Sequence, residues 1–513
     1  MTALYRNGPI HSPAEPGATA LLVEDGRVAW LGADEDAPSA PHVVDLAGAL
    51  VTPAFVDAHV HTTNTGVVRR GLDLSATRSA AQLLDAVATH AAALPADAVV
   101  IGHGWDESTW PQPVPPDADA LDRAGGGRRV YLSQASVHSA VVSATLLAAA
   151  EPAATGYDES GWLRLAAHHA VRERAFGSLT ASQRRDAQRA ALRAAAALGI
   201  AAVHECGGPG TSSEDDFCAL LALPAAEPLP EVYGYWGELG AAAKARELGG
   251  VGAGGDLYAD GALGSHTAYL RVPYADGHGS GHPYLSADQV PSHLVDCVHL
   301  GVQGGFHAVG DAAIAAVLTG FAAAARAVGL DRLRAGRHRV EHLEILDREL
   351  MRALVEHNVT ASVQPAFDRL WGGERQMYAQ RLGVDRSLAS NPIAALAGVG
   401  VTLAFGSDAP VTPLDPWGSV RAATAHHNPA SRISVRAAFA AHTRGGWRAV
   451  HRDGEGVLVP GAPATFAVWE VSGPLDGGLP VLRSTDPDEP DPPLPVCRLT
   501  ALRGNVIYDR GET

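Results

Sequence analysis

Residues with metal-binding side chains stand at the ends of four short apolar runs in this 513-residue chain. The runs are AFVDAHVH, VQGGFHAVGD, HRVEHLE and TLAFGSDAP. The candidate ligands within them are His59, His61, His307, His342 and Asp408. Imidazole nitrogen and carboxylate oxygen suit zinc and similar divalent ions, and such an ion makes water nucleophilic near neutral pH. The pattern therefore predicts a metal site for hydrolytic chemistry.

Each candidate has an ordinary structural alternative when it is taken alone. The chain has 23 histidines, so a chance His-x-His pair such as His59 and His61 is expected. His307 or His342 alone is more often a hydrogen-bonded residue at a strand end, and Gly-Ser-Asp at 406–408 is typical of a turn or a helix cap. In combination, every member falls at the C-terminal end of a predicted strand, where barrel enzymes place their chemistry. His59 and His61 also face one side of a strand, because side chains alternate with a period of two.

Strands and helices alternate through the middle of the chain. Apolar runs predict eight strands, and helical stretches separate most of them. The predicted strands are 54–61, 200–205, 231–236, 255–260, 302–307, 338–343, 359–364 and 401–407. This count indicates an α/β fold built on a distorted (β/α)8 TIM barrel. A doubly wound sheet is the alternative, but no Gly-x-Gly-x-x-Gly motif follows the first strand.

The two ends of the chain and one long gap frame the barrel. Residues 1–52 and 452–513 have β character, including the hairpin pattern VEDGRVAWLG, and we expect them to form one small β-sandwich. The barrel is then expected at 53–451. About 140 residues separate its first two strands, and the part at about 70–178 predicts an inserted subdomain that acts as a substrate lid.

Composition limits the classes of partner. The formal net charge of −17 argues against nucleic acid or an anionic membrane as a partner, but it says little about the substrate. A small-molecule substrate is expected from the predicted hydrolytic chemistry. Four cysteines without a CxxC pair fit a reducing compartment. The first residues do not resemble a signal peptide, and no apolar run is expected to span a membrane. We interpret the chain as cytoplasmic, with a homodimer left open.

Taken together, the motifs resemble a known superfamily. They are TPAFVDAHVH, HGWDESTWPQPVPP, DGALGSHTAYL, FHAVGDAAI, RVEHLEIL and GSDAPVTPLDPWGSV. This set resembles the metal-dependent amidohydrolases, and more narrowly amidohydrolase family 3, the branch that includes N-substituted formamide deformylases. The resemblance runs from about residue 20 to residue 470. It implies a barrel, a flanking β-sandwich and a hydrolytic metal centre.

The resemblance also implies roles for the candidate ligands. His59 and His61 would end strand one, His307 strand five, His342 strand six and Asp408 strand eight. Asp408 would contact the metal-bound water and act first as general base and then as general acid. His342 would be a ligand or a hydrogen-bond partner of that water.

Asp256 is a departure from the family pattern. In this branch the corresponding position usually holds a lysine, which is carboxylated and bridges two metal ions. Aspartate cannot form a carbamate and is several atoms shorter, so we expect it not to reach between two ions. The sequence therefore predicts one zinc ion, or another divalent metal, bound by His59, His61 and either His307 or Asp408. Two ions, with Asp256 as an extra site carboxylate, are the alternative.

Other departures concern the substrate pocket. Asp-Gly-His is common before the lid helix, but this chain has Ser136-Val137-His138; Ser143 replaces a usual Asn, and His266 stands where Arg is common. The candidate pocket residues are Trp105, Asp106, Trp110, His138, His266 and Gln364. Trp105 and Trp110 could equally be core aromatics. His204 could approach the site or be a satisfied core histidine.

The expected function is hydrolysis of a non-peptide C–N bond in an amide, formamide or cyclic amide or amidine. Hydrolytic deamination at a mononuclear site is the first alternative, because it uses the same residues. A catalytically silent barrel that serves as a binding module is the second. The retained ligands argue against that second alternative, whereas the missing lysine favours it slightly.

Overall fold

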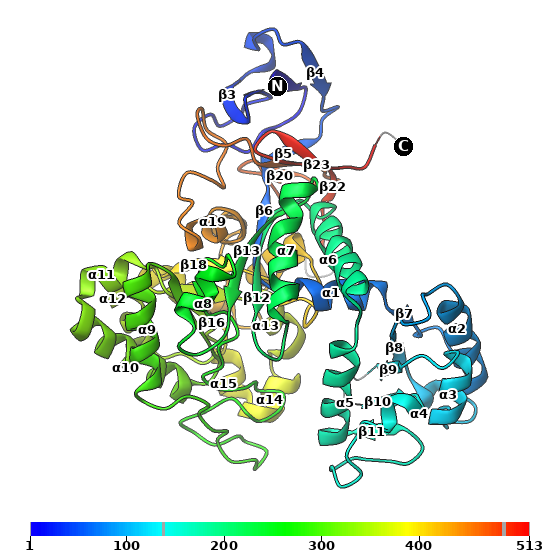
Figure 1. Cartoon of the computed structure of the whole chain (residues 1–513). Helices are drawn as coiled ribbons and strands as arrows, with labels where there is room; N and C mark the ends of the chain where they lie inside the picture. Colours follow the sequence, from blue (N-terminus) through cyan, green and yellow to red (C-terminus); the bar gives the residue numbers. More distant parts are fainter. Residues whose placement is uncertain (1, 136–138, 485–488, 512–513) are drawn as a thin grey trace. The chain divides into compact units, whose positions relative to one another are not determined.

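The computed structural model describes residues 2–135, 139–484 and 489–511 (Figure 1). The chain divides into two compact units. One unit comprises 1–61 and 192–513, and the other is Thr62–Ala191.

The larger unit is built around eight parallel strands that form a nearly closed barrel. In sheet order these are β6 (Phe55–Val60), β12 (Ile200–Gly207), β13 (Glu231–Trp236), β14 (Gly252–Ala253), β15 (Gln303–Ala308), β16 (Arg339–His342), β17 (Thr360–Val363) and β18 (Thr402–Phe405). Two backbone hydrogen bonds join the chain beyond β18 to β6: Asp408 N donates to His59 O at 2.7 Å, and His61 N donates to Ala409 O at 2.9 Å. The predicted (β/α)8 fold class is confirmed.

The fourth strand differs from its prediction. A strand was expected at 255–260, but β14 ends at Ala253. Gly254 and Gly255 follow, and Gly255 has a φ of +75°, a conformation that a β-strand does not contain. The next residues run irregularly beside β15, where His307 N donates to Leu257 O at 2.9 Å and Ala259 N donates to His307 O at 2.8 Å. Asp256 therefore lies on a loop rather than within a barrel strand.

Helices alternate with the strands, as the pattern predicts. They are α7 (Glu214–Ala226), α8 (Ala242–Glu247), α9 (Gln289–Leu300), α10 (Asp311–Val328), α11 (Leu330–Ala335), α12 (Arg348–Glu356), α13 (Pro365–Trp371), α14 (Met377–Leu382), α15 (Val384–Ala389), α16 (Ile393–Val399), α17 (Pro416–Thr424), α18 (Val435–Ala440) and α19 (Gly446–Ala449). Several begin at side-chain caps. Ser213 accepts from Asp216 N, and Asp347 accepts from Glu349 N and Leu350 N, which satisfies donors that a helix start leaves free.

Helix α10 is longer than the apolar runs that the sequence was expected to contain, although it does not indicate a membrane span. Its 18 residues are long and apolar enough to cross a membrane by length and composition. However, Ile314, Val317 and Phe321 are buried in one core cluster with Phe306 of β15 and Val340 of β16. These contacts are those of a helix that covers a barrel strand.

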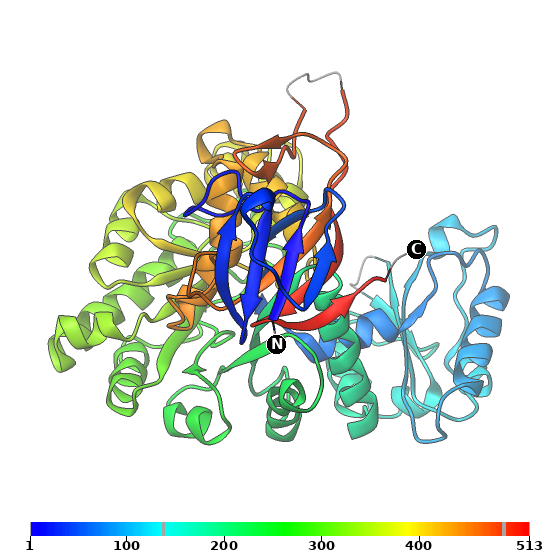
Figure 2. The same cartoon turned by 90° about the horizontal axis from the view of Figure 1, so that it is seen from above.

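The two ends of the chain form paired four-stranded sheets (Figure 2). One has the order β3 (Arg27–Gly32), β2 (Ala20–Glu24), β1 (Thr2–Arg6), β4 (His42–Asp45), and the other β23 (Asn505–Asp509), β22 (Val496–Leu502), β19 (Phe466–Glu470), β5 (Leu50–Pro53). Tyr5 and Val28 share a core cluster with Val51 and Phe466, so the two sheets pack together. The hairpin pattern holds at Asp25-Gly26, where both φ angles are positive, as a type I′ turn requires. A small hairpin joins β20 (Leu475–Asp476) to β21 (Leu479–Pro480).

The smaller unit has its own five-stranded sheet, in the order β11 (Trp162–Arg164), β10 (Ser139–Val142), β9 (Val130–Gln134), β8 (Val100–Trp105), β7 (Leu72–Asp73). Its helices are α1 (Thr62–Arg70), α2 (Ala80–Ala92), α3 (Ala118–Ala124), α4 (Ala144–Leu147), α5 (Leu165–Gly177) and the start of α6 (Ala181–Ala196). In the run VVSATLLAAA, the β-branched Val141 and Val142 belong to β10, and helix α4 begins only at Ala144. A lid role for this unit stays a prediction.

Phe55 provides a test of how the barrel and the sandwich are joined. It is fully buried, and its ring lies 5.0 Å from Trp417 of α17 and 5.7 Å from Trp469 of β19. We expect Phe55→Ala to lower the free energy of unfolding by about 3–5 kcal/mol, because it opens a cavity among these rings. Urea denaturation measures this loss. Val43→Ala, at a side chain that is 55% exposed, is the control and should change little. A loss below about 1 kcal/mol for Phe55→Ala would contradict this account.

Candidate metal centre

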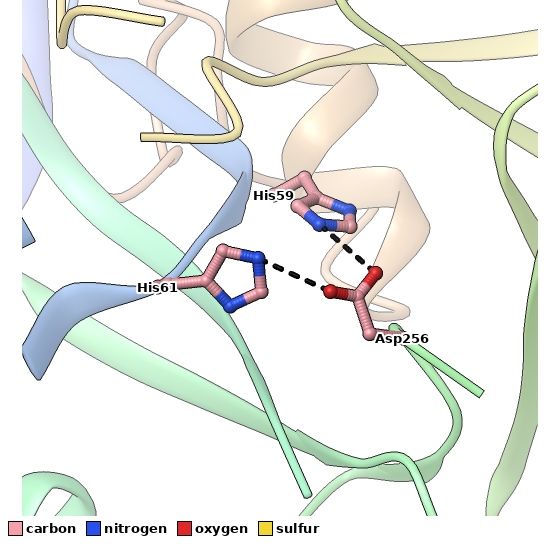
Figure 3. Close-up of side chains that lie close together, drawn as sticks. All are labelled: His59, His61 and Asp256. Carbon is pink, nitrogen blue, oxygen red and sulfur yellow. Dashed lines mark ion pairs between the residues drawn. The ribbon is translucent and has the colours of Figure 1, made fainter. Parts of the chain in front are cut away.

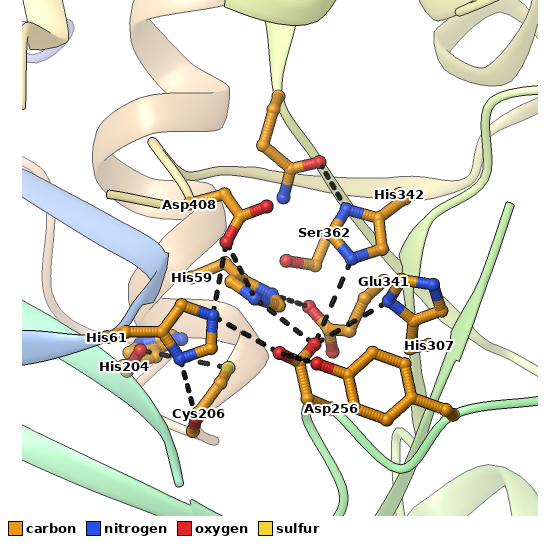
Figure 4. Close-up of polar contacts among 12 residues, drawn as sticks. His59, His61, His204, Cys206, Asp256, His307, Glu341, His342, Ser362 and Asp408 are labelled. Atoms are coloured by element: carbon orange, nitrogen blue, oxygen red, sulfur yellow. Dashed lines mark hydrogen bonds and ion pairs between the residues drawn. The ribbon is translucent and has the colours of Figure 1, made fainter. Parts of the chain in front are cut away.

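The five predicted ligands and Asp256 converge at the C-terminal ends of the barrel strands (Figure 4). His59 lies on β6, with His61 directly beyond it; His307 and His342 lie on β15 and β16. Asp256 and Asp408 lie on the loops after β14 and β18. Two of these residues have unusual backbones, with φ of +71° at His342 and +56° at Asp408. Non-glycine residues in this region are strained and gather at functional sites.

One group of ligand atoms is formed by His59, His61, Asp256 and Asp408. His59 Nε2 lies 3.5 Å from Asp256 Oδ1 and 3.4 Å from Asp408 Oδ1. His61 Nε2 lies 3.2 Å from Asp256 Oδ2 and 3.2 Å from Asp408 Oδ1. Figure 3 shows the two imidazoles directed at the Asp256 carboxylate. Tetrahedral zinc, with bonds of about 2.1 Å, needs ligand atoms roughly 3.4 Å apart. The spacing of this group fits that requirement.

A second group lies on the other side of the Asp256 carboxylate. His307 Nδ1 is 3.6 Å from Asp256 Oδ1, and His342 Nε2 is 4.0 Å from the same oxygen. The rings of His307 and His342 are 4.4 Å apart. Asp256 therefore lies between two pairs of histidines. Its short side chain reaches this position because the Gly254–Gly255 loop carries its backbone off the strand path. The expected count of one ion stays a prediction.

The outer nitrogen of each histidine is held by an acceptor. His59 Nδ1 donates to Glu341 Oε2, His61 Nδ1 to Cys206 O, and His342 Nδ1 to Gln364 Oε1, each at 2.9 Å; His307 Nε2 donates to Gly261 O at 3.1 Å. These bonds fix which nitrogen faces the centre, so each imidazole presents its inner nitrogen there, as a lone pair when the ring is neutral.

Those lone pairs face carboxylate oxygens that also need a positive partner. Among the described residues, four buried atoms at the centre have no hydrogen-bond partner: His59 Nε2, His307 Nδ1, His342 Nε2 and Asp256 Oδ1. A neutral imidazole and a carboxylate at these distances repel one another unless a proton or a metal ion lies between them. The donor set therefore fits a divalent metal.

The electrostatic state of the site leads to the same interpretation. Burial opposes ionisation of Asp256, but His61 and the other imidazoles hold its pKa well below the usual value. Burial also opposes charge on His61, yet Asp256 and Asp408 raise its pKa well above the usual value. The same two carboxylates overcome burial at His342 and raise its pKa to about 9. The anionic carboxylates thus retain protons on the imidazoles, and a metal ion would replace those protons.

A buried ion pair between Arg339 and Glu341 contacts the outer nitrogen of His59, and the sequence did not predict it. Arg339 and Glu341 are fully buried. Arg339 donates to Glu341 Oε1 at 2.5 Å and to Glu341 Oε2 at 2.8 Å, and also to Ser362 Oγ at 2.8 Å. Burial opposes the charge on Glu341, but Arg339 and His59 hold its pKa far below the usual value. Glu341 is therefore a carboxylate that orients His59; its place one residue before His342 was the available signal.

Of the two alternatives left open for His204, a site residue or a core histidine, the structure shows the core histidine. It is fully buried, and its Nδ1 lies 3.1 Å from Arg339 Nη1. Burial and the Arg339 charge hold its pKa well below the usual value, so it is a neutral acceptor for the guanidinium.

Two further residues support the His307 side. Asp260, from the DGALGS motif, accepts from Val309 N at 3.0 Å and from Gly310 N at 2.8 Å, which ties the loop after β14 to the end of β15. Tyr258 donates to Asp256 Oδ2 at 3.0 Å, and its ring lies 4.6 Å from His307. Motif spacing alone gave no role for either residue.

The structure places the substrate-pocket candidates in several locations. Gln364 is buried and bound to His342, which makes it an orienting residue. His266 lies on the long loop after β14, with its Nε2 2.8 Å from Asp276 Oδ2. His138 lies outside the described residues.

Trp105, Asp106 and Trp110 belong to the smaller unit. Both tryptophans are buried in its core, with their indole N–H groups donating to Leu132 O and Thr77 O. Asp106 caps a short turn by accepting from Ser108 N.

Known proteins define the class to which this fold and site belong. The sequence profile of the Amidohydrolase family matches residues 42–508, so the chain belongs to that family. It is 27% identical to the putative amidohydrolase YtcJ of Bacillus subtilis, over 99% of this chain and 100% of that protein. The chain is therefore a hydrolase of the metal-dependent kind that acts on C–N bonds other than peptide bonds. The narrower resemblance to formamide deformylases stays a prediction.

Solved structures agree on the fold. An uncharacterized metal-dependent hydrolase from Pyrococcus furiosus superposes with a TM-score of 0.75 at 24% identity, covering 91% of this chain and 98% of that one. Atrazine chlorohydrolase TrzN from Arthrobacter aurescens, solved with zinc, has a TM-score of 0.55 at 15% identity, covering 99% and 95%.

The contact between Gln364 and His342 can be tested by its effect on metal retention. Gln364→Leu removes the acceptor for His342 Nδ1, so we expect metal affinity to fall roughly 10–100-fold, the usual effect of losing such an outer partner. Competition with a chromophoric chelator measures this change. Gln380→Leu, at an exposed position of α14, is the control. If Gln364→Leu instead raised KM while metal affinity stayed at the wild-type value, Gln364 would be a substrate-binding residue.

Proposed function

We propose that this chain hydrolyses a C–N bond in a small amide, formamide or cyclic amide or amidine, with a metal-activated water as nucleophile. The observation that carries the proposal is the set of inward lone pairs on His59, His61, His307 and His342 around Asp256 and Asp408. A divalent ion bound there supplies Lewis acidity and lowers the pKa of water.

Zinc is the metal that the donor set favours. His59, His61, Asp256 and Asp408 offer two nitrogens and two carboxylates, with near-tetrahedral spacing of 3.2–3.5 Å. Nitrogen and oxygen donors in this geometry suit zinc. His307 and His342 stand beside this group and line the same site.

Asp408 is the proposed proton carrier. Its Oδ1 lies 3.4 Å from His59 Nε2 and 3.2 Å from His61 Nε2, and its Oδ2 takes no part in these ion pairs. One oxygen can therefore face the ion while the other accepts a proton from the nucleophilic water and returns it to the leaving nitrogen. Burial opposes ionisation of Asp408, but the surrounding imidazoles lower its pKa. The side chain is therefore a carboxylate at neutral pH and can accept a proton.

Hydrolytic deamination of a ring is the second candidate, because it needs the same residues. Ammonia is its product, whereas amide hydrolysis yields a carboxylate and an amine. A catalytically silent barrel is a weaker candidate, since the six side chains keep a spacing that a binding module would not require.

The cellular setting is proposed from composition. All four cysteines are free, and the chain carries a net charge of −17. These features support a cytoplasmic enzyme with a small-molecule substrate.

The test is a screen of N-formyl, N-acyl and cyclic amide or amidine substrates on zinc-loaded protein, with assays for ammonia and for new carboxylates. We expect turnover that a chelator abolishes and added zinc restores. Metal-loaded protein without turnover on any of these classes would favour the silent barrel.

Asp408→Asn tests the proton carrier. An amide keeps the shape of the side chain but cannot accept the proton, so we expect turnover to fall by about 10²–10⁴-fold while most of the metal is retained. Steady-state kinetics and elemental analysis of the same sample measure both quantities. Asp385→Asn, at an exposed position of α15, should leave both unchanged. Near-normal turnover in Asp408→Asn would remove this residue from the mechanism.

A further inference from the structure

We propose that the Asp256 carboxylate binds two divalent ions at once, and so takes the place of the carboxylated lysine that the family pattern leads one to expect. The inference rests on the proposed function, because it concerns the same centre. It makes the centre independent of carbamate formation.

The first step is the position of the two carboxylate oxygens. Oδ2 lies 3.2 Å from His61 Nε2, on the side shared with Asp408. Oδ1 lies 3.6 Å from His307 Nδ1 and 4.0 Å from His342 Nε2, on the opposite side. His59 Nε2 is 3.5 Å from Oδ1. Oδ1 is thus shared by His59, His307 and His342, whereas Oδ2 faces His61. The carboxylate therefore presents an oxygen to each pair of histidines, which is what a bridging ligand requires.

The second step is the need for a cation on the His307 and His342 side. Their outer nitrogens donate to Gly261 O and to Gln364 Oε1, so their inner nitrogens are directed at Asp256 Oδ1. His307 Nδ1, His342 Nε2 and Asp256 Oδ1 are buried without a hydrogen-bond partner among the described residues. One ion held by His59, His61 and Asp408 leaves these three atoms without a ligand. A second ion between them would bind all three.

The third step is how a side chain with one methylene reaches that position. A Cβ added at Gly254 would lie 2.5 Å from Gly305 Cα, and one at Gly255 would lie 3.0 Å from Cys206 Sγ. A Cβ at Gly237 would lie 2.9 Å from the Asp256 carbonyl carbon. The loop therefore passes closer to the neighbouring strands than residues with side chains permit. The position of the backbone therefore brings the short Asp256 side chain to the centre, whereas a lysine would get there by the length of its side chain.

The fourth step is the fixed orientation of the carboxylate. Tyr258 donates to Asp256 Oδ2 at 3.0 Å, and its ring packs 4.6 Å from His307. This contact sets the rotation of the carboxylate between the two histidine pairs.

The experiment counts ions in the intact protein. Metal-free chain is loaded with Mn²⁺ or Zn²⁺ in carbonate-free buffer, freed of excess metal and analysed by elemental analysis, and the Mn²⁺ form is examined by electron paramagnetic resonance. We expect about two ions per chain, a spin-coupled Mn²⁺ spectrum, and no increase on adding bicarbonate. One ion per chain, or a second ion that appears only with bicarbonate, would overturn the proposal.

Two variants locate the bridge. Asp256→Asn should lower the content to about one ion and abolish the spin coupling, whereas Asp288→Asn, at an exposed position just before α9, should keep both. Gly254→Ala changes no ligand but pushes the loop away from Gly305, so it should also lose the second ion. Two coupled ions in a folded Asp256→Asn or Gly254→Ala protein would contradict the assignment. Spin coupling in the wild-type chain decides the count even when a variant does not fold.

These readouts separate the inference from the proposed function. Two bridged ions without hydrolysis of any substrate class would uphold the bridge and overturn the function. Hydrolysis by a chain that holds a single ion would uphold the proposed function and overturn the bridge.

Discussion

The hydrogen bonds that close the barrel also build its metal site. Asp408 N donates to His59 O, and His61 N donates to Ala409 O. These bonds fix the register between the first and last parts of the barrel, which lie about 350 residues apart in the sequence. A slip of one residue would turn the alternating side chains to the opposite face. Closure of the fold and the approach of His59 and His61 to Asp408, at 3.4 and 3.2 Å, are therefore one constraint.

The charged pair beneath the site contributes orientation more than stability. Removing Arg339 and Glu341 from water costs several kcal/mol for each ion, and their attraction offsets that cost only when every donor is used. Here the guanidinium also binds Ala58 O and lies 4.3 Å from the centre of the Tyr235 ring. A well-packed apolar pair could fill this space without an electrostatic cost. It could not accept the proton of His59 Nδ1 and so direct Nε2 at the metal position.

Sequence reasoning succeeded where the information is local and failed where it depends on contacts. Strands such as β6, β12 and β15 were predictable because apolar runs and strand-end polar residues recur with the same pattern. The shortened β14 was missed, since a pattern of apolar residues does not report a glycine with positive φ. Glu341 was missed because its partner His59 lies 282 residues away. The sequence left Trp105 open between a pocket and a core, because a tryptophan whose N–H finds a backbone acceptor packs well in a core too.

The comparison of aspartate with lysine shows what backbone placement changes chemically. A lysine with four methylenes must lose rotational freedom and react with carbon dioxide before it can bear a negative charge at the site. Asp256 is anionic from the start, has few rotatable bonds and is held by Tyr258. The conformational entropy of Asp256 is lost when the loop folds, because Gly254 and Gly255 set the path of the backbone that carries it. The anion is thus already in place before metal arrives, and binding an ion requires only that protons leave the imidazoles around it.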